Sequence, residues 1–537
     1  MPFLHAQQNP PKIPSQTRFD ISSPTVLLEK AEVLSGSGQI ERPNWISDPE
    51  RSRAYTANFA VTRFSWNEIA VGFVPGGDGK IELKLMGAWE EASAGNIYRQ
   101  ETLWDEVKVF GASIENGGFE KATDGVPDGW RSTGARVEVG NAFEGNNAAR
   151  TWHNQVLATS IQVKSGEPVT IRLKAKACLP PGYRDMRRLA GRGTLAHQAA
   201  KHFLKGANLG NYLEAPPNQK WGANYTEADF KHMAEEKFDH VRVPIAWQHY
   251  AGAAPGYEIA PGIYGKVDFL VTNALKHGLN AIINIHHFDT FTTDPSGKKD
   301  ELIALWKQIA AHYATAPEGV AFELLNEPRD KATTSILNPI YAEVIREIRK
   351  TNPKRVLFVG PGKWNSIDEL GALLLPEDDE NLIVTVHCYD PFFFTHQGAT
   401  WSGPDTKVTG IRFPGPPAKP LLVDPKLNLR KGVIDWIARY NTQPRERNPS
   451  SPIAFQDRLK LAHDWSEYYG RPIHMGEFGA YVAADPESRA NFYREFRKAL
   501  DQYGIGWAVW DWKAGFKYWD EANNRPAPRM HDALFGK

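Results

Sequence analysis

The 537-residue chain contains little cysteine and no excess of charge of either sign. Its two cysteines, Cys178 and Cys388, lie far apart, and neither has a second ligand at a metal-binding spacing. We therefore expect neither a disulfide nor a cysteine metal site. The 63 basic and 63 acidic residues cancel, which gives no electrostatic reason to expect nucleic acid or an acidic membrane surface as a partner. No apolar run is long enough to cross a bilayer.

The first residues, MPFLHAQQNPPKIPSQ, lack the positively charged end and the apolar stretch of a signal peptide. Either the protein is intracellular, or a leader has been removed from the chain. Tryptophan, in contrast, is plentiful, with 17 residues. Because a buried indole needs a partner for its N–H, we expect roughly one tryptophan in three to lie in a binding surface and the others to fill aromatic cores.

The N-terminal region, up to about Ala177, alternates apolar with polar residues in short segments that are separated by turn clusters. The segments are residues 81–89, 105–114, 135–140, 159–164 and 169–177. This pattern predicts an antiparallel β-sandwich or jelly roll over residues 17–181, with two small sandwiches as the alternative. A linker is predicted over residues 182–204.

One motif of this region, ENGGFEKATDGVPDGW over residues 115–130, resembles the opening of carbohydrate-binding jelly-roll modules. The resemblance covers little of the domain. A structural sandwich that only packs on its neighbour is an equally good interpretation, because a fold does not determine a function.

The C-terminal region, residues 205–537, has a different period. Eight apolar runs alternate with segments whose apolar residues recur every three or four positions, as in amphipathic helices. Eight strand–helix repeats predict an α/β fold, a parallel (β/α)8 TIM barrel. Active sites of such barrels lie at the C-terminal ends of the strands. Polar and aromatic residues collect there in the sequence: Asn211, Glu214, Arg242, His286, His287, Asn326, Glu327, Trp364, Asn365, His387, Tyr389, Glu477, Trp510 and Asp511.

Two of the carboxylates among these residues, Glu327 and Glu477, lie on nearly opposite strands. Strand alternation places Glu323, Leu325 and Glu327 on one face, so Glu327 is expected to point inward where Pro328 ends the strand. Glu477 ends the seventh strand. Cleavage of a glycosidic bond requires such a pair, one carboxyl protonated and the other ionised.

The neighbours of the pair suggest which carboxyl has which role. A guanidinium, Arg242, and a phenol, Tyr389, are expected to keep Glu477 ionised as the nucleophile. The negative charge beside Glu327 then raises its pKa and suits it to be the general acid and base. We expect the carboxyls to be about 5 to 5.5 Å apart, the separation that retains anomeric configuration.

The barrel resembles glycoside hydrolase family 5, and within it the bacterial endoglucanase group called subfamily 25. The matching stretches are GANLGNYLEAP, FDHVRVPIAW, INIHHF, ALWKQIAAHY, FELLNEP, VHCYDPFFFTHQGATW and IHMGEFGAYVAADPESR. The resemblance implies that Glu327 is the acid/base and Glu477 the nucleophile, with hydrolysis of internal β-1,4-glucan bonds. It implies sugar contacts from Asn211, Glu214, His286, His287, Asn326, His387, Tyr389, His396, Trp401 and Trp510.

The sequence also departs from the family pattern. About 55 residues from Ser402 to Pro452 and beyond, rich in proline, arginine and asparagine, separate the sixth and seventh strands. A loop of this length without structure of its own is usually functional or disordered, so we expect it to border the cleft and to alter the outer sugar subsites. HHF, CYD and WDW also differ from the usual residues at their positions.

A metal is not expected. His286 and His287 are adjacent, so in a strand they point to opposite faces, and no HExxH motif or third spaced ligand accompanies them. We read Glu323 as a structural partner deeper in the barrel. Asp289, Asp390 and Asp511 are read as loop or supporting carboxylates.

The sequence therefore predicts a retaining endo-β-1,4-glucanase with no metal or other cofactor, acting on β-glucan polymers or oligosaccharides. A β-mannanase or an enzyme of mixed specificity is the alternative within the class. A carbohydrate-binding protein that has lost catalysis is the alternative of another class. We expect a secreted or periplasmic monomer that binds neither nucleic acid nor membrane.

Overall fold

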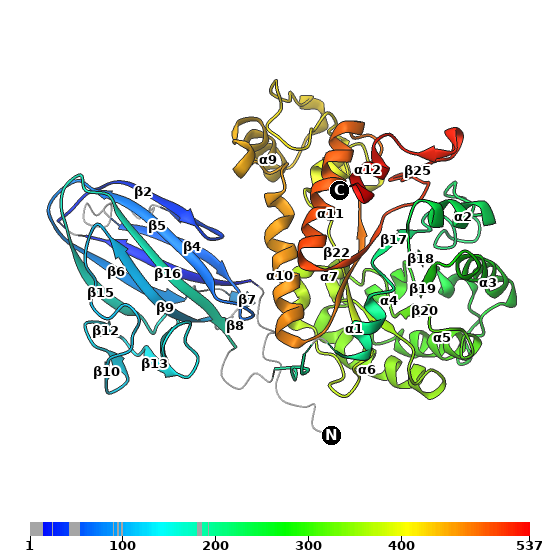
Figure 1. Cartoon of the computed structure of the whole chain (residues 1–537), viewed down its shortest axis with the longest axis horizontal. Helices are drawn as coiled ribbons and strands as arrows, with labels where there is room; N and C mark the ends of the chain where they lie inside the picture. Colours follow the sequence, from blue (N-terminus) through cyan, green and yellow to red (C-terminus); the bar gives the residue numbers. More distant parts are fainter. Residues whose placement is uncertain are drawn as a thin grey trace. The chain divides into compact units, whose positions relative to one another are not determined.

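The computed structural model describes residues 14–23, 25–41, 54–87, 89, 91–93, 96–97, 100–179, 185–191 and 193–536. The chain forms two compact units, Met1–Asp185 and Met186–Lys537 (Figure 1). The elements of unit 1 within the described residues are β-strands, and unit 2 contains a closed ring of parallel strands with helices around it. Among the described residues, no helix has both the length and the apolar character that a membrane crossing needs.

Unit 1 is a single sandwich of two antiparallel six-stranded sheets. One sheet has the order β12-β15-β6-β1-β4-β3, and the other has the order β13-β14-β9-β16-β5-β2. The bounds are β1 Ser15–Ser22, β2 Leu28–Ser35, β3 Gly38–Glu41, β4 Ala54–Val61, β5 Asn67–Pro75, β6 Gly79–Gly87, β9 Glu101–Phe110, β12 Arg131–Ser132, β13 Arg136–Val139, β14 Asn147–Thr151, β15 Leu157–Val163 and β16 Val169–Cys178.

The alternative of two small sandwiches is wrong. Strand β1, from the start of the chain, pairs with β6, and β6 pairs with β15, so early and late strands share one sheet. Alternation explains the common core: every second residue of β16 is buried, and Ile171 and Leu173 pack in the same cluster as Phe19 and Trp104.

The motif over residues 115–130 holds the sandwich together. The Asn116 side chain donates to the carbonyls of Lys121 (2.7 Å) and Asp128 (3.0 Å). Phe119 and Trp130 are buried in the core with ring centroids 5.2 Å apart. A Cβ on Gly117 would lie 2.0 Å from the Val107 carbonyl oxygen, so only glycine fits there. These contacts give the motif a structural role.

Unit 2 confirms the predicted (β/α)8 barrel. Its eight strands close in sequence order: β17 Lys205–Asn208, β18 His240–Val243, β19 Asn280–Asn284, β20 Val320–Glu323, β21 Leu357–Val359, β22 Leu382–His387, β23 Ile473–Phe478 and β24 Gly506–Val509. Apart from the first residues of β17 and β19, which are half-buried, all eight are buried along their length, which is why they read as apolar runs.

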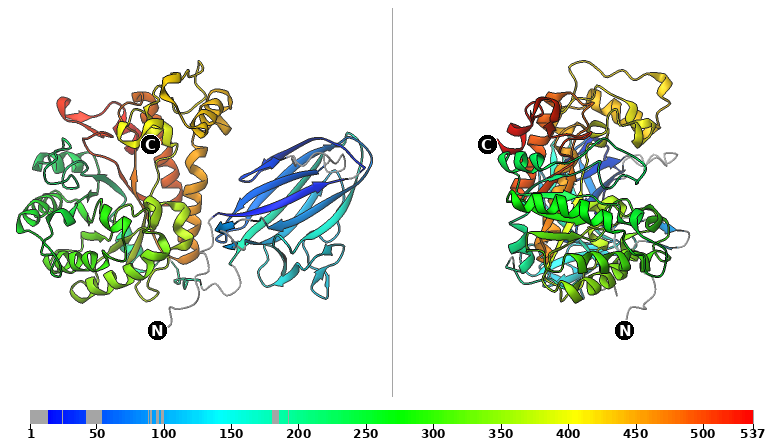
Figure 2. Two further views of the ribbon diagram at one scale, coloured as in Figure 1. Left: turned by 180° about the vertical axis from the view of Figure 1, so that it is seen from behind. Right: turned by 90° about the vertical axis from the view of Figure 1, so that its right-hand side faces the viewer.

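Helices lie on the outside of the barrel strands in both views of Figure 2. Between strands, α2 Glu227–Glu235, α3 Pro261–Lys276, α5 Lys299–His312, α6 Thr334–Thr351, α10 Ile453–Tyr469 and α11 Pro486–Tyr503 are the long ones. Shorter helices are α1 Leu195–Ala200, α4 Asp289–Thr293, α7 Gly362–Asn365, α8 Phe392–Thr395 and α12 Met530–Phe535.

The predicted linker is shorter than residues 182–204, because the chain from Met186 onward belongs to the barrel unit. The Leu189 N–H donates to the carbonyl of Tyr469 at 3.0 Å. Ala196 of α1 and Phe203 pack against the barrel residues Ile282, Ala321, Val356, Phe358 and Ile383. This segment therefore covers the end of the barrel at which the strands begin.

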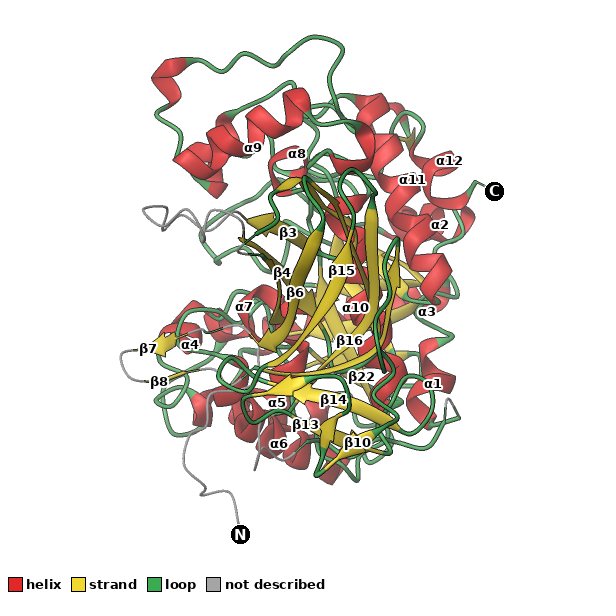
Figure 3. Cartoon of the chain, turned by 90° about the vertical axis from the view of Figure 1, so that its left-hand side faces the viewer, coloured by secondary structure: helices red, strands yellow, loops and turns green. Residues whose placement is uncertain are grey.

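The long segment between β22 and β23 is not a structureless loop. It contains α9, Lys431–Thr442, with long connections on either side of it (Figure 3). Trp436 of α9 packs edge-on against Phe393 of α8, with centroids 5.4 Å apart. The Tyr440 hydroxyl accepts the Arg412 N–H at 2.7 Å. We refer to residues 408–452 as the insertion.

Candidate active site

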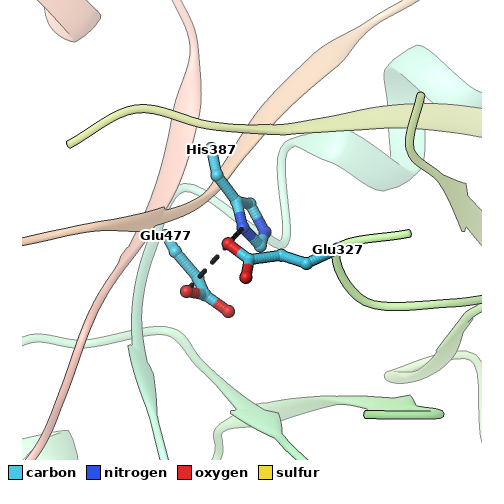
Figure 4. Close-up of side chains that lie close together, drawn as sticks. All are labelled: Glu327, His387 and Glu477. Carbon is cyan, nitrogen blue, oxygen red and sulfur yellow. Dashed lines mark hydrogen bonds and ion pairs between the residues drawn. The ribbon is translucent and has the colours of Figure 1, made fainter. Parts of the chain in front are cut away.

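Three side chains converge at the C-terminal end of the barrel, two from strands β22 and β23 and one from the loop after β20. Glu327, His387 and Glu477 point toward one another (Figure 4), and one ligand-type atom of each lies within 4.8 Å of the others. The Nδ1 atom of His387 is 2.9 Å from Oε1 of Glu327 and 3.7 Å from Oε2 of Glu477. A pair of carboxyl oxygens within 4.8 Å is close enough for the two groups to act on the same sugar atom.

Arg242 is the buried cation of the site, and its five N–H groups are all engaged. It donates twice to Glu323, from Nε (2.6 Å) and Nη2 (2.7 Å). The remaining N–H groups donate to Asn208 (2.7 Å), Asn326 (2.6 Å) and Oε1 of Glu477 (2.8 Å). Glu323 is thus the deeper structural partner that the sequence indicated, and it fixes the guanidinium plane.

Glu477 has a donor on each oxygen. Oε1 accepts from Arg242, and Oε2 accepts the Tyr389 hydroxyl at 2.9 Å. The pKa of Glu477 is raised overall, because burial and the neighbouring Glu327 outweigh His387, Arg242 and the Tyr389 hydrogen bond, which lower it. The two hydrogen bonds favour the ionised form and hold the carboxylate in one orientation. This is the environment of a nucleophile.

Glu327 also points into the site, but it lies in the loop after β20, where strand alternation does not apply. Strand β20 ends at Glu323, four residues earlier, and Glu327 has a left-handed backbone with φ of 45°. Its N–H donates to the Asn365 side chain at 2.9 Å, and the Pro328 carbonyl accepts the Trp364 N–H at 3.0 Å. The loop after β21 therefore holds Glu327 inward, so the side chain points where it was expected to, but strand alternation is not the reason.

The pKa of Glu327 is raised to about 7, as a general acid requires, but the cause differs from the predicted one. Burial is the largest contribution, Arg242 and Arg329 oppose it, and the carboxylate that adds to it is Glu323. Burial also lowers the pKa of His387 to about 4, so the imidazole is neutral near pH 7. Either group of the His387–Glu327 hydrogen bond can donate, depending on which carries the proton.

The predicted strand-three residues line one wall of the site. The Asn326 oxygen accepts from Arg242, so its amide nitrogen faces Nε2 of His286 at 3.2 Å. Burial lowers the pKa of His286 well below its usual value and that of His287 to about 4. The His286 ring stacks on Trp510, 5.7 Å away at 12°. His286 and His287 are perpendicular rather than on opposite faces.

Asn211 and Glu214 follow strand β17. The Glu214 carboxylate is buried and accepts the N–H groups of Asn211 and, at 2.9 Å, Tyr212. Burial raises its pKa to about 7. The structure thus gives Glu214 the role of shaping the loop that carries Asn211, whose φ is 63°.

His396 and Trp401 follow strand β22. His396 is buried, with its ring stacked on Phe392 at 4.2 Å and edge-on to Tyr389 at 4.9 Å, so it supports Tyr389. Trp401 is 61% exposed and touches Tyr481 edge-on, with centroids 4.8 Å apart. An exposed indole beside the nucleophile strand is a surface on which a sugar ring can stack.

Sequence reasoning missed one supporting amide, Asn208, and one aromatic, Trp221, and it did not foresee how Asn365 acts. Asn208 holds Arg242 from β17 and donates to the carbonyls of Gly476 and Val509. Asn365 positions Glu327, and Trp221, 40% exposed, lies edge-on to His287 at 5.9 Å. Asn208 ends an apolar run, as do the residues that were identified, so position alone could have flagged it.

The group Glu327, His387 and Glu477 is also where, among the described residues, three potential metal ligands meet. His387 Nδ1 already makes a hydrogen bond to Glu327, and the Arg242 cation already lies 2.8 Å from Glu477. The hydrogen bond with His387 and the ion pair with Arg242 therefore give each of the two carboxyl groups a partner.

A (β/α)8 barrel with a protonatable glutamate after strand four and a glutamate bound by a guanidinium on strand seven defines a glycoside-cleaving barrel. The pattern of the family Cellulase (glycosyl hydrolase family 5) matches residues 200–515, more than half of the chain. The chain belongs to glycosyl hydrolase family 5.

Characterised relatives agree over the barrel. Endoglucanase H of Acetivibrio thermocellus is 29% identical over 57% of this chain and 29% of its own length. Endoglucanase 3 of Fibrobacter succinogenes is 30% identical over 60% of this chain and 51% of its own. The chain thus spans about half or less of these two relatives. Endoglucanase C of A. thermocellus is 28% identical, with 91% of its length covered.

Solved structures of endoglucanases are also similar to this chain. Endoglucanase Cel5A from the hyperthermophilic Thermotoga maritima is 33% identical with a TM-score of 0.54, covering 63% of this chain and 99% of that chain. The same enzyme in complex with mannotriose is 32% identical with a TM-score of 0.54, at the same coverage.

Proposed function

We propose that the protein is a retaining endo-β-1,4-glucanase. The observation that carries this proposal is the pair Glu327 and Glu477, with carboxyl oxygens within 4.8 Å and only Glu477 bonded to Arg242. Relatives named endoglucanases support the substrate class. Assignment to subfamily 25 remains a prediction.

In the first step, the Glu477 carboxylate attacks the anomeric carbon while the Glu327 carboxylic acid gives its proton to the glycosidic oxygen. One C–O bond breaks, and a C–O bond to Glu477 forms. In the second step, the Glu327 carboxylate takes a proton from water, and the water oxygen replaces Glu477. Glu327 is then protonated again, and the sugar keeps its original configuration.

In this proposal, the surrounding residues bind the glucan substrate. Aromatic faces stack on sugar C–H groups, and polar groups bond the hydroxyls. Trp510 and Trp401 provide the faces. Asn211, His286, His287, Asn326 and His387 provide hydrogen bonds, while Glu214, Tyr389 and His396 hold them in place.

The test measures reducing ends released from barley β-glucan and carboxymethyl cellulose, with the first anomer formed followed by proton NMR. We expect release with retained β configuration. An α product would contradict the double displacement. No release from any β-glucan or mannan would favour the alternative of a carbohydrate-binding protein, against which the intact Glu327–Glu477 pair argues.

A β-mannanase or mixed activity is the second candidate, and the solved relative in complex with mannotriose substrate favours it. Parallel kcat/KM values on cellulose, glucomannan and mannan separate the two. A mannan value equal to or above the glucan value would make the protein a mannanase or a mixed enzyme.

We further propose that unit 1 binds insoluble glucan and that the protein acts outside the cytoplasm as a monomer. Polymeric glucan is too large to enter a cell intact, which supports the location. Pull-down on insoluble glucan, with and without residues 1–185, tests the binding role. Equal retention of both forms would leave unit 1 as a structural module.

A further inference from the structure

The Trp401 loop, residues 398–406, presents an aromatic ring that makes few contacts with the rest of the barrel. Trp401 is 61% exposed, and its ring contacts are an edge to Tyr481 at 4.8 Å and Phe516 at 6.4 Å. A free indole samples several rotamers and must lose that freedom to bind a sugar. Its usefulness as a stacking surface therefore depends on how firmly the loop beneath it is fixed.

The loop is closed by its own backbone. The Gly398 N–H donates to the Thr406 carbonyl at 2.6 Å, and the Thr406 hydroxyl donates to the Ala399 carbonyl at 2.6 Å. Gly398 has φ of 78°, which a glycine adopts without strain. These bonds shape the loop, but they do not tie it to the rest of the molecule.

The tie comes from the insertion through Asp405. This aspartate is only 6% exposed, and its carboxylate accepts the Arg430 backbone N–H at 3.4 Å and pairs with the Arg430 guanidinium. Arg430 is the residue that immediately precedes α9. The Arg430 side chain is 80% exposed, so the ion pair itself contributes little, and the larger cost comes from leaving the buried Asp405 carboxylate without its partners.

The insertion is itself anchored firmly enough to serve as a support. The buried Gln397 side chain donates to the Ile411 carbonyl at 2.9 Å and accepts the Ile411 N–H at 3.0 Å. Ser450 donates to the Arg412 carbonyl at 2.8 Å, and Phe413 packs on Phe394 at 5.4 Å. Asp405 is thus joined to a fixed body.

We propose that Asp405 and Arg430 are positioning residues that fix Trp401 for stacking on an outer sugar, so that the insertion determines how strongly the enzyme prefers long chains. The proposal rests on the proposed function and deepens it. Substrates that reach Trp401 gain from the ion pair, and substrates that occupy only the sites next to Glu327 and Glu477 do not.

The first experiment compares KM and kcat for cellohexaose and for an aryl cellobioside. We expect Trp401→Ala to raise the KM for cellohexaose about tenfold, which corresponds to about 1.4 kcal/mol. Asp405→Ala and Arg430→Gln should each raise it severalfold, with kcat on the aryl cellobioside unchanged. Arg430→Lys should restore most of the loss. Lys431→Gln removes a charge from the next, exposed residue and should behave as wild type.

A double-mutant cycle separates positioning from general damage. If Arg430 acts through Trp401, the variant Arg430→Gln with Trp401→Ala has the same KM as Trp401→Ala alone. Additive effects would overturn the inference. So would a wild-type KM for both Arg430→Gln and Asp405→Ala while Trp401→Ala is impaired, and the proposed function would then stand.

Fluorine NMR of the full chain labelled with 5-fluorotryptophan reads the loop without turnover. The resonance that Trp401→Ala removes belongs to Trp401, and Arg430→Gln should shift or broaden it, whereas Lys431→Gln should not. An unchanged Trp401 resonance in Arg430→Gln would overturn the inference whatever the activity. Wild-type protein inactive on every β-glycan would instead contradict the proposed function.

Discussion

Arg242 uses every N–H of its guanidinium on side chains of the site, and the two bonds to Glu323 leave it no freedom to rotate. The hydrogen bond from Arg242 to Glu477 therefore has a fixed direction in addition to its favourable energy. Among the residues that the structure describes, no cation makes such a bond to Glu327, which instead pairs with a neutral histidine. The asymmetry of the two carboxyls, and hence their roles, comes from this one arginine and from Tyr389.

Replacing the nucleophile tests that asymmetry. We expect Glu477→Ala to lower kcat by about 10⁴-fold or more, because no covalent intermediate can form. The cavity next to Arg242 can hold a small anion, so azide should restore activity and give an α-glycosyl azide. Glu477→Gln keeps the acceptor for Arg242 but not the nucleophile, so azide should not rescue it. Substantial activity in Glu477→Ala without azide would remove the assignment.

The raised pKa of Glu327 makes a prediction about stability. A carboxyl with a pKa of about 7 in the folded protein and near 4.5 when unfolded binds more protons when folded. Stability therefore falls as pH rises from 4.5 to 7, and neutral glutamine at this position avoids the loss. We expect Glu327→Gln to raise the free energy of unfolding by about 2 kcal/mol at pH 8.

The same comparison at pH 4.5 should give almost no difference, because both side chains are then neutral. Glu318→Gln, at an exposed glutamate, is the control and should change stability little at either pH. Urea unfolding at the two pH values measures the differences. A gain for Glu327→Gln that did not depend on pH would contradict the raised pKa of Glu327.

At the scale of elements, the contact between β22 and β23 positions the histidine of the site. A Cβ on Gly476 of β23 would lie 2.6 Å from Thr385 Oγ1 and 2.9 Å from His387 Nε2, both on β22. Strands β22 and β23 can pair with His387 next to Glu477 only because residue 476 has no side chain. Glycine here permits close approach of two strands rather than an unusual backbone angle.

Gly476→Ala should therefore push His387 away from Glu327. We expect a loss of about 2 kcal/mol in unfolding free energy from overpacking and at least a tenfold fall in kcat. Gly265→Ala is the matched control: it lies in α3, where an added Cβ would meet nothing within 4 Å, and it should stabilise by about 0.5 to 1 kcal/mol. Circular dichroism melts and kcat on β-glucan check both. Equal behaviour of the two variants would refute the packing argument.

The elements that the sequence predicted are those whose environment leaves a periodic pattern. All eight barrel strands are buried on both sides, and the strands of the sandwich on one side, so both produce readable runs. The position of Glu327 was not predictable in this way, because it depends on a left-handed backbone and on Asn365 from another loop. α9 was missed although Val433, Ile437 and Tyr440 recur at helical spacing.

At the scale of the whole molecule, the chain consists of two separately packed units. Each has its own buried core, so each meets the requirement for independent folding. The boundary lies at Asp185 and Met186, well before the first barrel strand. The 19 residues between Met186 and Lys205 are therefore part of the barrel, and a division of the chain at Lys205 would cut through a core.

Two fragments test this boundary. Residues 186–537 should fold, melt within a few degrees of the barrel transition of the full chain, and keep its kcat/KM on soluble β-glucan. Residues 205–537 lack Ala196 and Phe203, which pack on Phe358 and Ile383. Loss of a buried phenylalanine alone removes about 3 to 5 kcal/mol. We expect this fragment to melt at least 10 °C lower or to be insoluble, as calorimetry would measure. Equal melting of the two fragments would place residues 186–204 outside the barrel after all.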